Sequence, residues 1–220
     1  MKSPTNQMLF HYWNELRGNR TAPSRLEVDP AHFIEILSET FILEMGLSGS
    51  FTFRLAGTRI CEQVGYELRG ADFAELAGPD HARTLEDDLG AIAARGQYGV
   101  FELAFRAPNG QTVLFEASVM PLVHTQGNVT RFLGAMAHMG GQRPMWLGTV
   151  PLTPQKLLRN DLYWPDGHPK AVETPAHQAP FLERNAQARI VHSNRRHFRV
   201  FEGGLSSAPL EMKVVPSVAK

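Results

Sequence analysis

The chain contains few residues whose types and spacing could support covalent or metal chemistry. Its single cysteine, Cys61, lies on the apolar face of a short predicted helix, where a thiol usually packs as a small hydrophobic side chain. The acidic run Glu86-Asp87-Asp88 follows one predicted helix, whereas a metal site draws its carboxylates from several elements. The sequence lacks Gly-x-Ser-x-Gly, P-loop, Gly-x-Gly-x-x-Gly and His-Glu-x-x-His motifs. We therefore expect a protein that is not an enzyme and that holds no metal.

Arg54 is a charged residue inside an apolar, strand-like run, where a guanidinium must face solvent or be paired. Alternation along a strand places Arg54 on the same face as Thr52. It places three apolar residues on the opposite face: Phe51, Phe53 and Leu55. The solvent-facing side is the default position for Arg54. In the alternative, Arg54 points inward and pairs with a carboxylate or with the acid group of a ligand.

A basic stretch with interleaved aromatic residues runs from Arg189 to Phe201. The pair Arg195-x-x-x-Arg199 resembles the arginine motif of PilZ domains, which bind cyclic dinucleotides, but the companion Asp/Asn-x-Ser-x-x-Gly motif does not follow. Basic and aromatic residues together can also contact nucleic acid. Because the stretch is short and the whole chain is neutral, a short hairpin or a segment that contacts a protein partner is favoured over nucleic-acid binding.

Composition divides the 220-residue chain near Met139. Residues 1–139 carry 11 Lys and Arg against 16 Asp and Glu, whereas residues 140–220 carry 11 against 6 and hold 9 of the 15 prolines. The segment 140–220 is therefore predicted to be a proline-rich, basic tail that is largely irregular. The sequence shows no long apolar run, no secretory signal at its start and no second cysteine, which favours a cytoplasmic protein without membrane contact.

Residues 1–38 are predicted to form flanking helices. Apolar residues share one helical stripe from about Gln7 to Leu16, and Asp29-Pro30 is typical of the start of a second helix. A helix of about ten residues must gain its stability from packing. The stripe either docks on its own domain or pairs with a second helix, in a homodimer or a complex. The candidate interface residues are Leu9, Tyr12, Trp13 and Leu16.

Residues 39–139 contain five strand-like runs with a helical segment between the second and the third. The runs are residues 40–45, 50–55, 98–106, 112–123 and 130–139. Asn109-Gly110 and Gly127-Asn128 are hairpin signals, so the last three strands should be antiparallel neighbours. This order predicts an α+β fold with a five-stranded antiparallel sheet and crossover helices on one face. The predicted core includes Phe101, Leu103, Phe105, Phe115 and Phe132.

Several short motifs in the first two thirds of the chain resemble one known family. They are Trp13-x-x-x-Arg17, Pro23-x-Arg25, Asp29-Pro30, Phe53-Arg54-Leu55-Ala56-Gly57-Thr58 and Gly65-Tyr66-Glu67-Leu68-Arg69-Gly70. Together they resemble the opening of an alphaproteobacterial PAS-domain family, over about residues 12–139. The resemblance implies a PAS-like domain at residues 39–139. It also implies a sensory or protein-interaction module that acts in trans, in histidine-kinase pathways.

The resemblance does not identify a ligand. Cys61 lacks the Asn-Cys-Arg-Phe-type context of a photoreactive flavin site, and His81 stands at a helix start, which is usually a solvated position rather than a haem-binding one. We therefore expect no cofactor and a protein partner, either a signalling kinase or a regulator. A haem, a flavin or a small apolar ligand in the core is the alternative. The candidate pocket residues are Phe41, Phe53, Arg54, Cys61, Phe101, Phe115 and Phe132.

Overall fold

The computed structural model describes residues 1–124, 128–140, 144, 146–166, 190–191 and 200–201. The chain divides into two compact units, Met1–Ala171 and Val172–Lys220. In the second unit, β7 (Ile190–Val191) pairs antiparallel with β8 (Val200–Phe201). The predicted irregular tail over residues 167–189, 192–199 and 202–220 and the arginine pair Arg195 and Arg199 lie outside the described residues.

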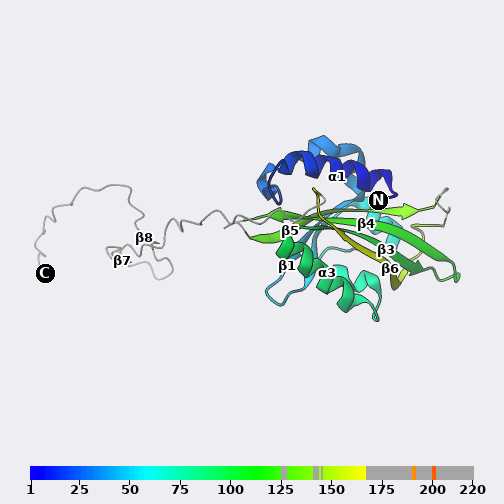
Figure 1. Ribbon diagram of the computed structural model, residues 1–220. Coiled ribbons are helices and arrows are strands. Elements are labelled where there is room, and N and C mark those ends of the chain that lie inside the picture. Colours follow the sequence, from blue (N-terminus) through cyan, green and yellow to red (C-terminus); the bar gives the residue numbers. More distant parts are fainter. Residues whose placement is uncertain (125–127, 141–143, 145, 167–189, 192–199, 202–220) are drawn as a thin grey trace, which may run out of the picture. The chain divides into compact units, whose positions relative to one another are not determined.

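The first unit is built on one antiparallel sheet with the strand order β2-β1-β5-β4-β3-β6 (Figure 1). The strands are β1 (Thr40–Met45), β2 (Phe51–Ala56), β3 (Tyr98–Arg106), β4 (Thr112–Val123), β5 (Val129–Met139) and β6 (Thr153–Tyr163). A helical crossover separates the first two strands from the others along the chain. The predicted α+β class, the order of the elements along the chain and the antiparallel pairing of the last three strands are confirmed, but the sheet has six strands rather than five.

The sixth strand comes from the segment that composition assigned to an irregular tail. It pairs with β3 from Thr153, opposite Arg106, to Tyr163, opposite Tyr98. Because β6 is an edge strand in which Leu157 is the one buried residue, its sequence lacks a strong apolar alternation. Pro154 is tolerated there because an edge strand needs N–H donors on one side only. The sheet therefore continues past residue 139.

Three helical elements cover one face of the sheet, which we call the inner face: α2 (Thr58–Val64), η3 (Phe73–Ala77) and α3 (Ala82–Arg95). The rings of Phe41, Phe53 and Phe73 pack there with centroids 5.3–5.6 Å apart. The five predicted core residues are all fully buried in this cluster, which confirms their assignment: Phe101, Leu103, Phe105, Phe115 and Phe132. Phenylalanine rings thus fill much of the space between the sheet and the crossover helices.

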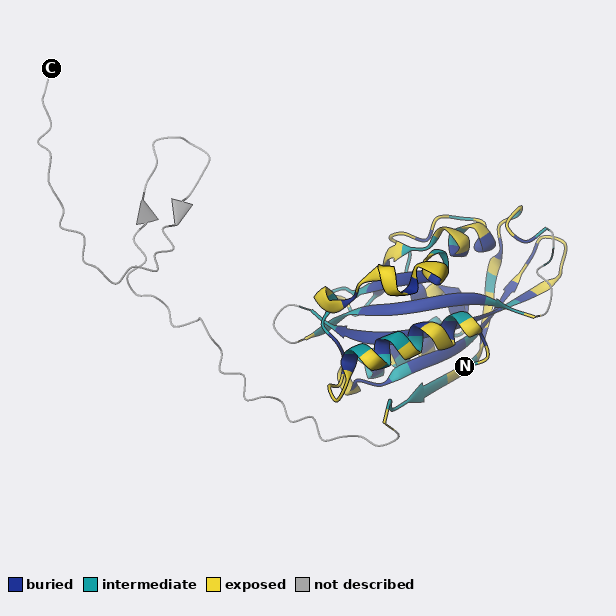
Figure 2. Ribbon diagram, turned by 90° about the horizontal axis from the view of Figure 1, so that it is seen from above, coloured by how far each residue is buried: buried dark blue, intermediate teal, exposed yellow. Residues whose placement is uncertain are grey.

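Two further helices, α1 (Pro4–Arg17) and η2 (Pro30–Glu39), lie on the opposite face, which we call the outer face. Figure 2 shows buried strands between helices whose outward surfaces are exposed. The residues that join these helices to the sheet include Leu9, Trp13, Phe33, Ile36, Ile42, Met120, Leu122, Leu133 and Ala135. The sheet is therefore packed on both faces. Among the residues described, no helix combines the length and the apolar content that a membrane crossing requires.

The apolar stripe of α1 packs against its own sheet. Leu9 and Trp13 are fully buried, and the indole N–H of Trp13 donates to the carbonyl oxygen of Pro121 over 2.9 Å. Tyr12 is half-buried, and its hydroxyl accepts a hydrogen bond from the backbone N–H of Asp29 over 2.8 Å. Leu16 is also half-buried. The choice of Leu9 and Trp13 as interface residues is thereby corrected, because their own domain already covers them.

The carboxylate of Glu116, on β4, holds the start of α1. It accepts hydrogen bonds from the backbone N–H groups of Lys2 (2.7 Å) and Ser3 (2.8 Å) and from the side-chain amide of Asn6 (3.0 Å). Ser118 completes the cluster by donating to the Asn6 side chain over 3.0 Å. Burial raises the pKa of Glu116, but the hydrogen bonds from Asn6, Ser3 and Lys2 lower it by more, so the net shift is downward. A buried carboxylate thus fixes α1 to the sheet.

A β-bulge in β2 changes which side chains reach the outer face. Leu43 pairs with Phe53, but Ile42 pairs with Leu55, so Arg54 is the extra residue in β2. An extra residue reverses the alternation that follows it. Leu55 therefore does not share the inner face with Phe53, as strict alternation predicted, but lies opposite Ile42 on the outer face and is 53% exposed.

Candidate functional site

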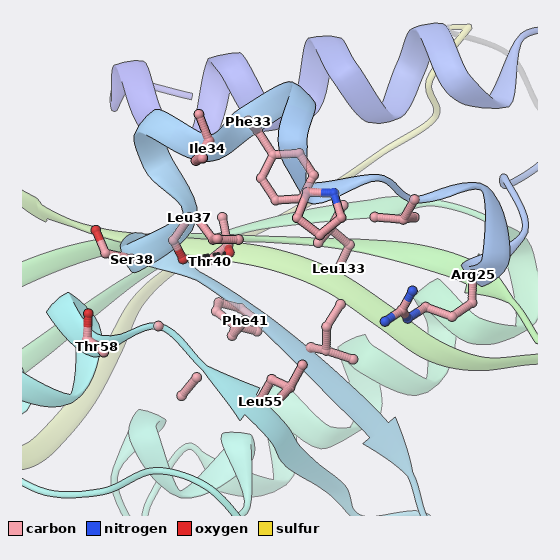
Figure 3. A pocket seen from close by; sticks show the side chains of 15 residues that line it. Arg25, Phe33, Ile34, Leu37, Ser38, Thr40, Phe41, Leu55, Thr58 and Leu133 are labelled. Carbon is pink, nitrogen blue, oxygen red and sulfur yellow. Dashed lines mark hydrogen bonds between the residues drawn. The ribbon is translucent and has the colours of Figure 1, made fainter.

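A pocket of about 520 Å³ opens on the outer face, between η2 and the strands β1, β2 and β5 (Figure 3). Its volume is within the range typical of small-molecule sites, about 300–1,000 Å³. The lining residues are Arg25, Val28, Pro30, Phe33, Ile34, Leu37, Ser38, Thr40, Phe41, Ile42, Leu55, Ala56, Gly57, Thr58 and Leu133. The pocket contains no residue of η3 or α3, and the start of α2 borders it through Gly57 and Thr58.

The walls of the pocket are mainly aliphatic and aromatic. Ile34 and Leu37, on η2, are 68% and 41% exposed, and Leu55 faces them from β2. Apolar side chains that remain this exposed around a concave surface indicate a binding site more strongly than the same residues scattered over the surface. The pocket can therefore bind an apolar group without chemical reaction.

Local sequence signals place η2 above the pocket. Asp29 caps this helix by accepting a hydrogen bond from the backbone N–H of Ala31 over 3.0 Å, and Pro30 occupies its first position. The backbone leaves helical geometry at Phe33 (φ −134°, ψ 32°), which kinks η2. Phe33 is buried while its neighbour Ile34 is exposed at the pocket.

Arg25, in η1 (Arg25–Glu27), is the one charged residue among the described residues that line the pocket. It is half-buried, and in the described part of the chain its guanidinium has no ion pair. Figure 3 shows Arg25 at one end of the pocket and Ser38 and Thr58 at the other. The pocket is thus apolar along its length, with a cation at one end.

The pocket is not where the candidate residues from sequence lie. Phe41 is the one of the seven that lines it. The other four phenylalanines are buried in the inner-face cluster: Phe53, Phe101, Phe115 and Phe132. Arg54 is exposed, as the default interpretation expected, and in addition it pairs with Glu44 over 3.0 Å. Six of the seven candidate residues therefore lie outside this pocket.

Cys61 lies on α2 and packs partly against the inner cluster. Burial and the neighbouring Glu67 carboxylate raise the pKa of the thiol. We expect Cys61 to react with iodoacetamide more slowly than free cysteine at pH 8, because the thiolate is the reactive form. Mass spectrometry of timed samples measures this rate, and unfolding the protein in urea should restore the rate of free cysteine. A faster rate in the folded protein would contradict the assignment.

Metal-binding side chains do not gather around the pocket or elsewhere in the described residues. Glu86 and Asp87 on α3 lie within 3.7 Å and 3.3 Å of Arg83, at helical spacing, and the third member of the acidic run, Asp88, accepts a hydrogen bond from Asn160 over 2.8 Å. These carboxylates are therefore engaged in local contacts.

Sequence reasoning missed most of the pocket. Pro23-x-Arg25 and Asp29-Pro30 stood out as motifs, but nothing local indicated that the loop before η2 borders a cavity. Leu55 was missed because the bulge is invisible to strict alternation. The segment Phe33-Ile34-x-x-Leu37 contains more apolar residues than a short helix needs for a single buried face. This excess is the signal that could have indicated the site.

Comparisons with known proteins give a family match and matches of low TM-score among solved structures. A family model described as a PAS domain matches residues 1–137. Among solved structures, the blue-light photoreceptor Aureochrome1 LOV in its light state is 20% identical, over 51% of this chain and 89% of its own, with a TM-score of 0.39. The PAS domain of a protein from Colwellia psychrerythraea is 12% identical, over 50% of this chain and 95% of its own, with a TM-score of 0.38. A search of curated proteins gave no match.

Proposed function

The chain belongs to the PAS domain family, and from this premise we propose that it is a sensory module that binds an apolar ligand in the outer-face pocket. The observation that carries the proposal is the concave apolar surface between η2 and β2, with Ile34, Leu37 and Leu55 exposed at it. Binding there is noncovalent, and the protein is not an enzyme.

The proposal includes an output through protein contacts. Phe33 of η2 lies 5.0 Å, between ring centroids, from Tyr12 of α1, and Tyr12 is hydrogen-bonded to Asp29 at the start of η2. A ligand that moves η2 therefore acts directly on α1. The moved helices would alter the surface offered to a cytoplasmic partner, either a signalling kinase or a regulator in a histidine-kinase pathway.

The alternative is a ligand between the sheet and the crossover helices. The phenylalanine rings of the inner-face cluster occupy much of that space, so a ligand there must displace buried side chains. Such repacking of a dense core costs free energy, whereas the outer-face pocket is open already. The packing therefore favours the outer-face site.

Methyl NMR with the neutral probe decanol tests the proposed site. Decanol is expected to shift the signals of the pocket methyl groups: those of Ile34, Leu37, Leu55 and Leu133. The inner-face methyl groups should stay unchanged: those of Leu85, Leu89 and Ile92. Shifts confined to the second set would place the ligand in the core. An absence of shifts in both sets would reject apolar binding by this domain.

A pair of variants sharpens the test. Ile34→Asp places a charge in the pocket wall and should weaken decanol binding about tenfold, because it removes over 1 kcal/mol of apolar contact. Leu47→Asp is the matched control, since Leu47 is fully exposed in the β1–β2 loop and does not line the pocket. Equal decanol affinities for the two variants would show that binding occurs elsewhere.

A further inference from the structure

We infer that the ligand of this pocket is an amphipathic monocarboxylate, an apolar chain with one acid group, and that Arg25 binds the acid group. The inference rests on the proposed function, since it concerns the same pocket. It goes further in naming the chemical class of the ligand and the residue that selects it. Three features of the pocket support it: Arg25 has no ion pair among the described residues, the acids Glu27, Asp29 and Glu44 are engaged elsewhere, and the pocket is apolar beyond Arg25.

The acids that are near Arg25 in the sequence are engaged elsewhere. Glu27 accepts hydrogen bonds from Arg20 (2.8 Å) and from the backbone N–H of Ser24 (2.7 Å). Asp29 caps η2. Both contacts follow from local structure, because Glu27 completes a capping box with Ser24. The fold thus turns these carboxylates away from the Arg25 guanidinium.

On the neighbouring strand β1, the acid Glu44 is engaged as well. Glu44 on β1 is held by Arg131 (2.5 Å) and Arg54 (3.0 Å), so two cations already share this carboxylate. Burial raises the pKa of Glu44, but these two arginines lower it by more, so it stays ionised and engaged. Glu44 is therefore not available to pair with Arg25.

A guanidinium that is half-buried beside apolar walls favours an anion of matching charge. Arginine binds a carboxylate through two parallel N–H···O hydrogen bonds, which a neutral hydroxyl cannot reproduce. One cation matches one negative charge, whereas a dianionic phosphate would bring a second charge into the apolar pocket without a partner. A cationic ligand would be repelled. A monocarboxylate therefore matches the charge of the pocket better than a neutral, cationic or dianionic ligand does.

The shape of the pocket determines the rest of the ligand. From Arg25 the pocket runs along Leu133, Phe41 and Leu55 toward Ser38 and Thr58 (Figure 3). A chain that lies in this direction buries methylene groups against aliphatic side chains, and each buried methylene contributes about 0.8 kcal/mol in transfer free energy. An unbranched or weakly branched chain fits this path, with its head at Arg25.

Calorimetric titration of the whole protein with decanoate and decanol tests the inference, because the two probes share a chain and differ in the head group. We expect decanoate to bind about tenfold more tightly than decanol, as a charged hydrogen-bonded pair in a half-buried site should give. Arg25→Gln should remove this difference and leave decanol affinity unchanged. Arg95→Gln, on the exposed end of α3, is the matched control and should keep the difference.

The outcomes separate this inference from the proposed function. Recognition by Arg25 is overturned if decanoate and decanol bind the wild type equally well, or if the difference between them persists in Arg25→Gln. In either case, decanol-induced shifts of the pocket methyl signals would still support the proposed binding site. A failure of both probes to bind overturns both proposals. Salt dependence provides a check that needs no variant. The preference for decanoate over decanol should decrease between 0.05 and 0.5 M salt, at roughly the concentrations where screening becomes strong. A preference that stays constant would contradict an ionic contact.

Discussion

Replacing Trp13 by alanine is expected to lower the free energy of unfolding by about 3–5 kcal/mol, which is typical of truncating a large buried aromatic residue. Trp13 is fully buried between α1 and the sheet and donates a hydrogen bond to Pro121. The guanidinium of Arg17 also lies 5.7 Å from its ring centroid. For a domain of this size the loss corresponds to a fall in melting temperature of roughly 10 °C.

Met8→Ala is the matched control, because Met8 lies on the same helix but is 43% exposed. Its effect on the melting temperature should be small. Light scattering on the same samples tests the remaining idea that α1 pairs with a second helix. If Trp13→Ala lowered the mass of an oligomer and left the melting temperature unchanged, Trp13 would be an interface residue and its burial in this fold would be contradicted.

Glu116→Ala is expected to cost about 3 kcal/mol at neutral pH. The carboxylate holds two backbone N–H groups and the amide of Asn6 at the start of α1, and the substitution leaves these donors without an acceptor in a buried position. The loss should concentrate on α1. Hydrogen exchange measured by mass spectrometry should show faster exchange in Pro4–Arg17 than in β3 or β4.

The same carboxylate makes stability depend on pH. Its folded-state pKa is below the ordinary value of 4.5, so ionisation stabilises the folded form. This contribution is complete above the ordinary pKa and is lost as the pH falls through the lower folded-state pKa. The gap in unfolding free energy between wild type and Glu116→Ala should therefore be largest near pH 7 and shrink below pH 4.5.

Urea unfolding at a series of pH values measures this gap. Glu62→Ala is the matched control, because Glu62 is exposed on α2 and holds no backbone N–H group in the described part of the chain. Its unfolding free energy should follow the wild type at each pH. A gap between wild type and Glu116→Ala that stayed constant down to pH 3 would show that the stabilisation comes from packing rather than from the charge.

Local patterns in the sequence were enough to predict the sheet that carries the pocket. Alternation in Tyr98–Arg106 and Thr112–Val123 predicted β3 and β4 to the residue, and Asn109-Gly110 predicted the hairpin between them. The buried phenylalanines followed from the same alternation. These features are local because a strand's faces and a tight turn depend on neighbouring residues.

Other features depended on partners far along the chain. The bulge that turns Leu55 outward exists only in the pairing of β2 with β1, and an edge strand such as β6 is defined by the strand it joins rather than by its own pattern. The stripe on α1 was visible, but only its position over Pro121 showed that it covers its own sheet.

The candidate site shows the same division. Local sequence was sufficient to predict that η2 begins at Asp29-Pro30, with an arginine before it at position 25. Only the tertiary structure shows that Arg25 borders an apolar pocket and that Glu27 and Asp29 contact other groups. The physical reason is that capping and periodicity act within a few residues, whereas a pocket and an unpaired charge are defined by what distant segments leave uncovered.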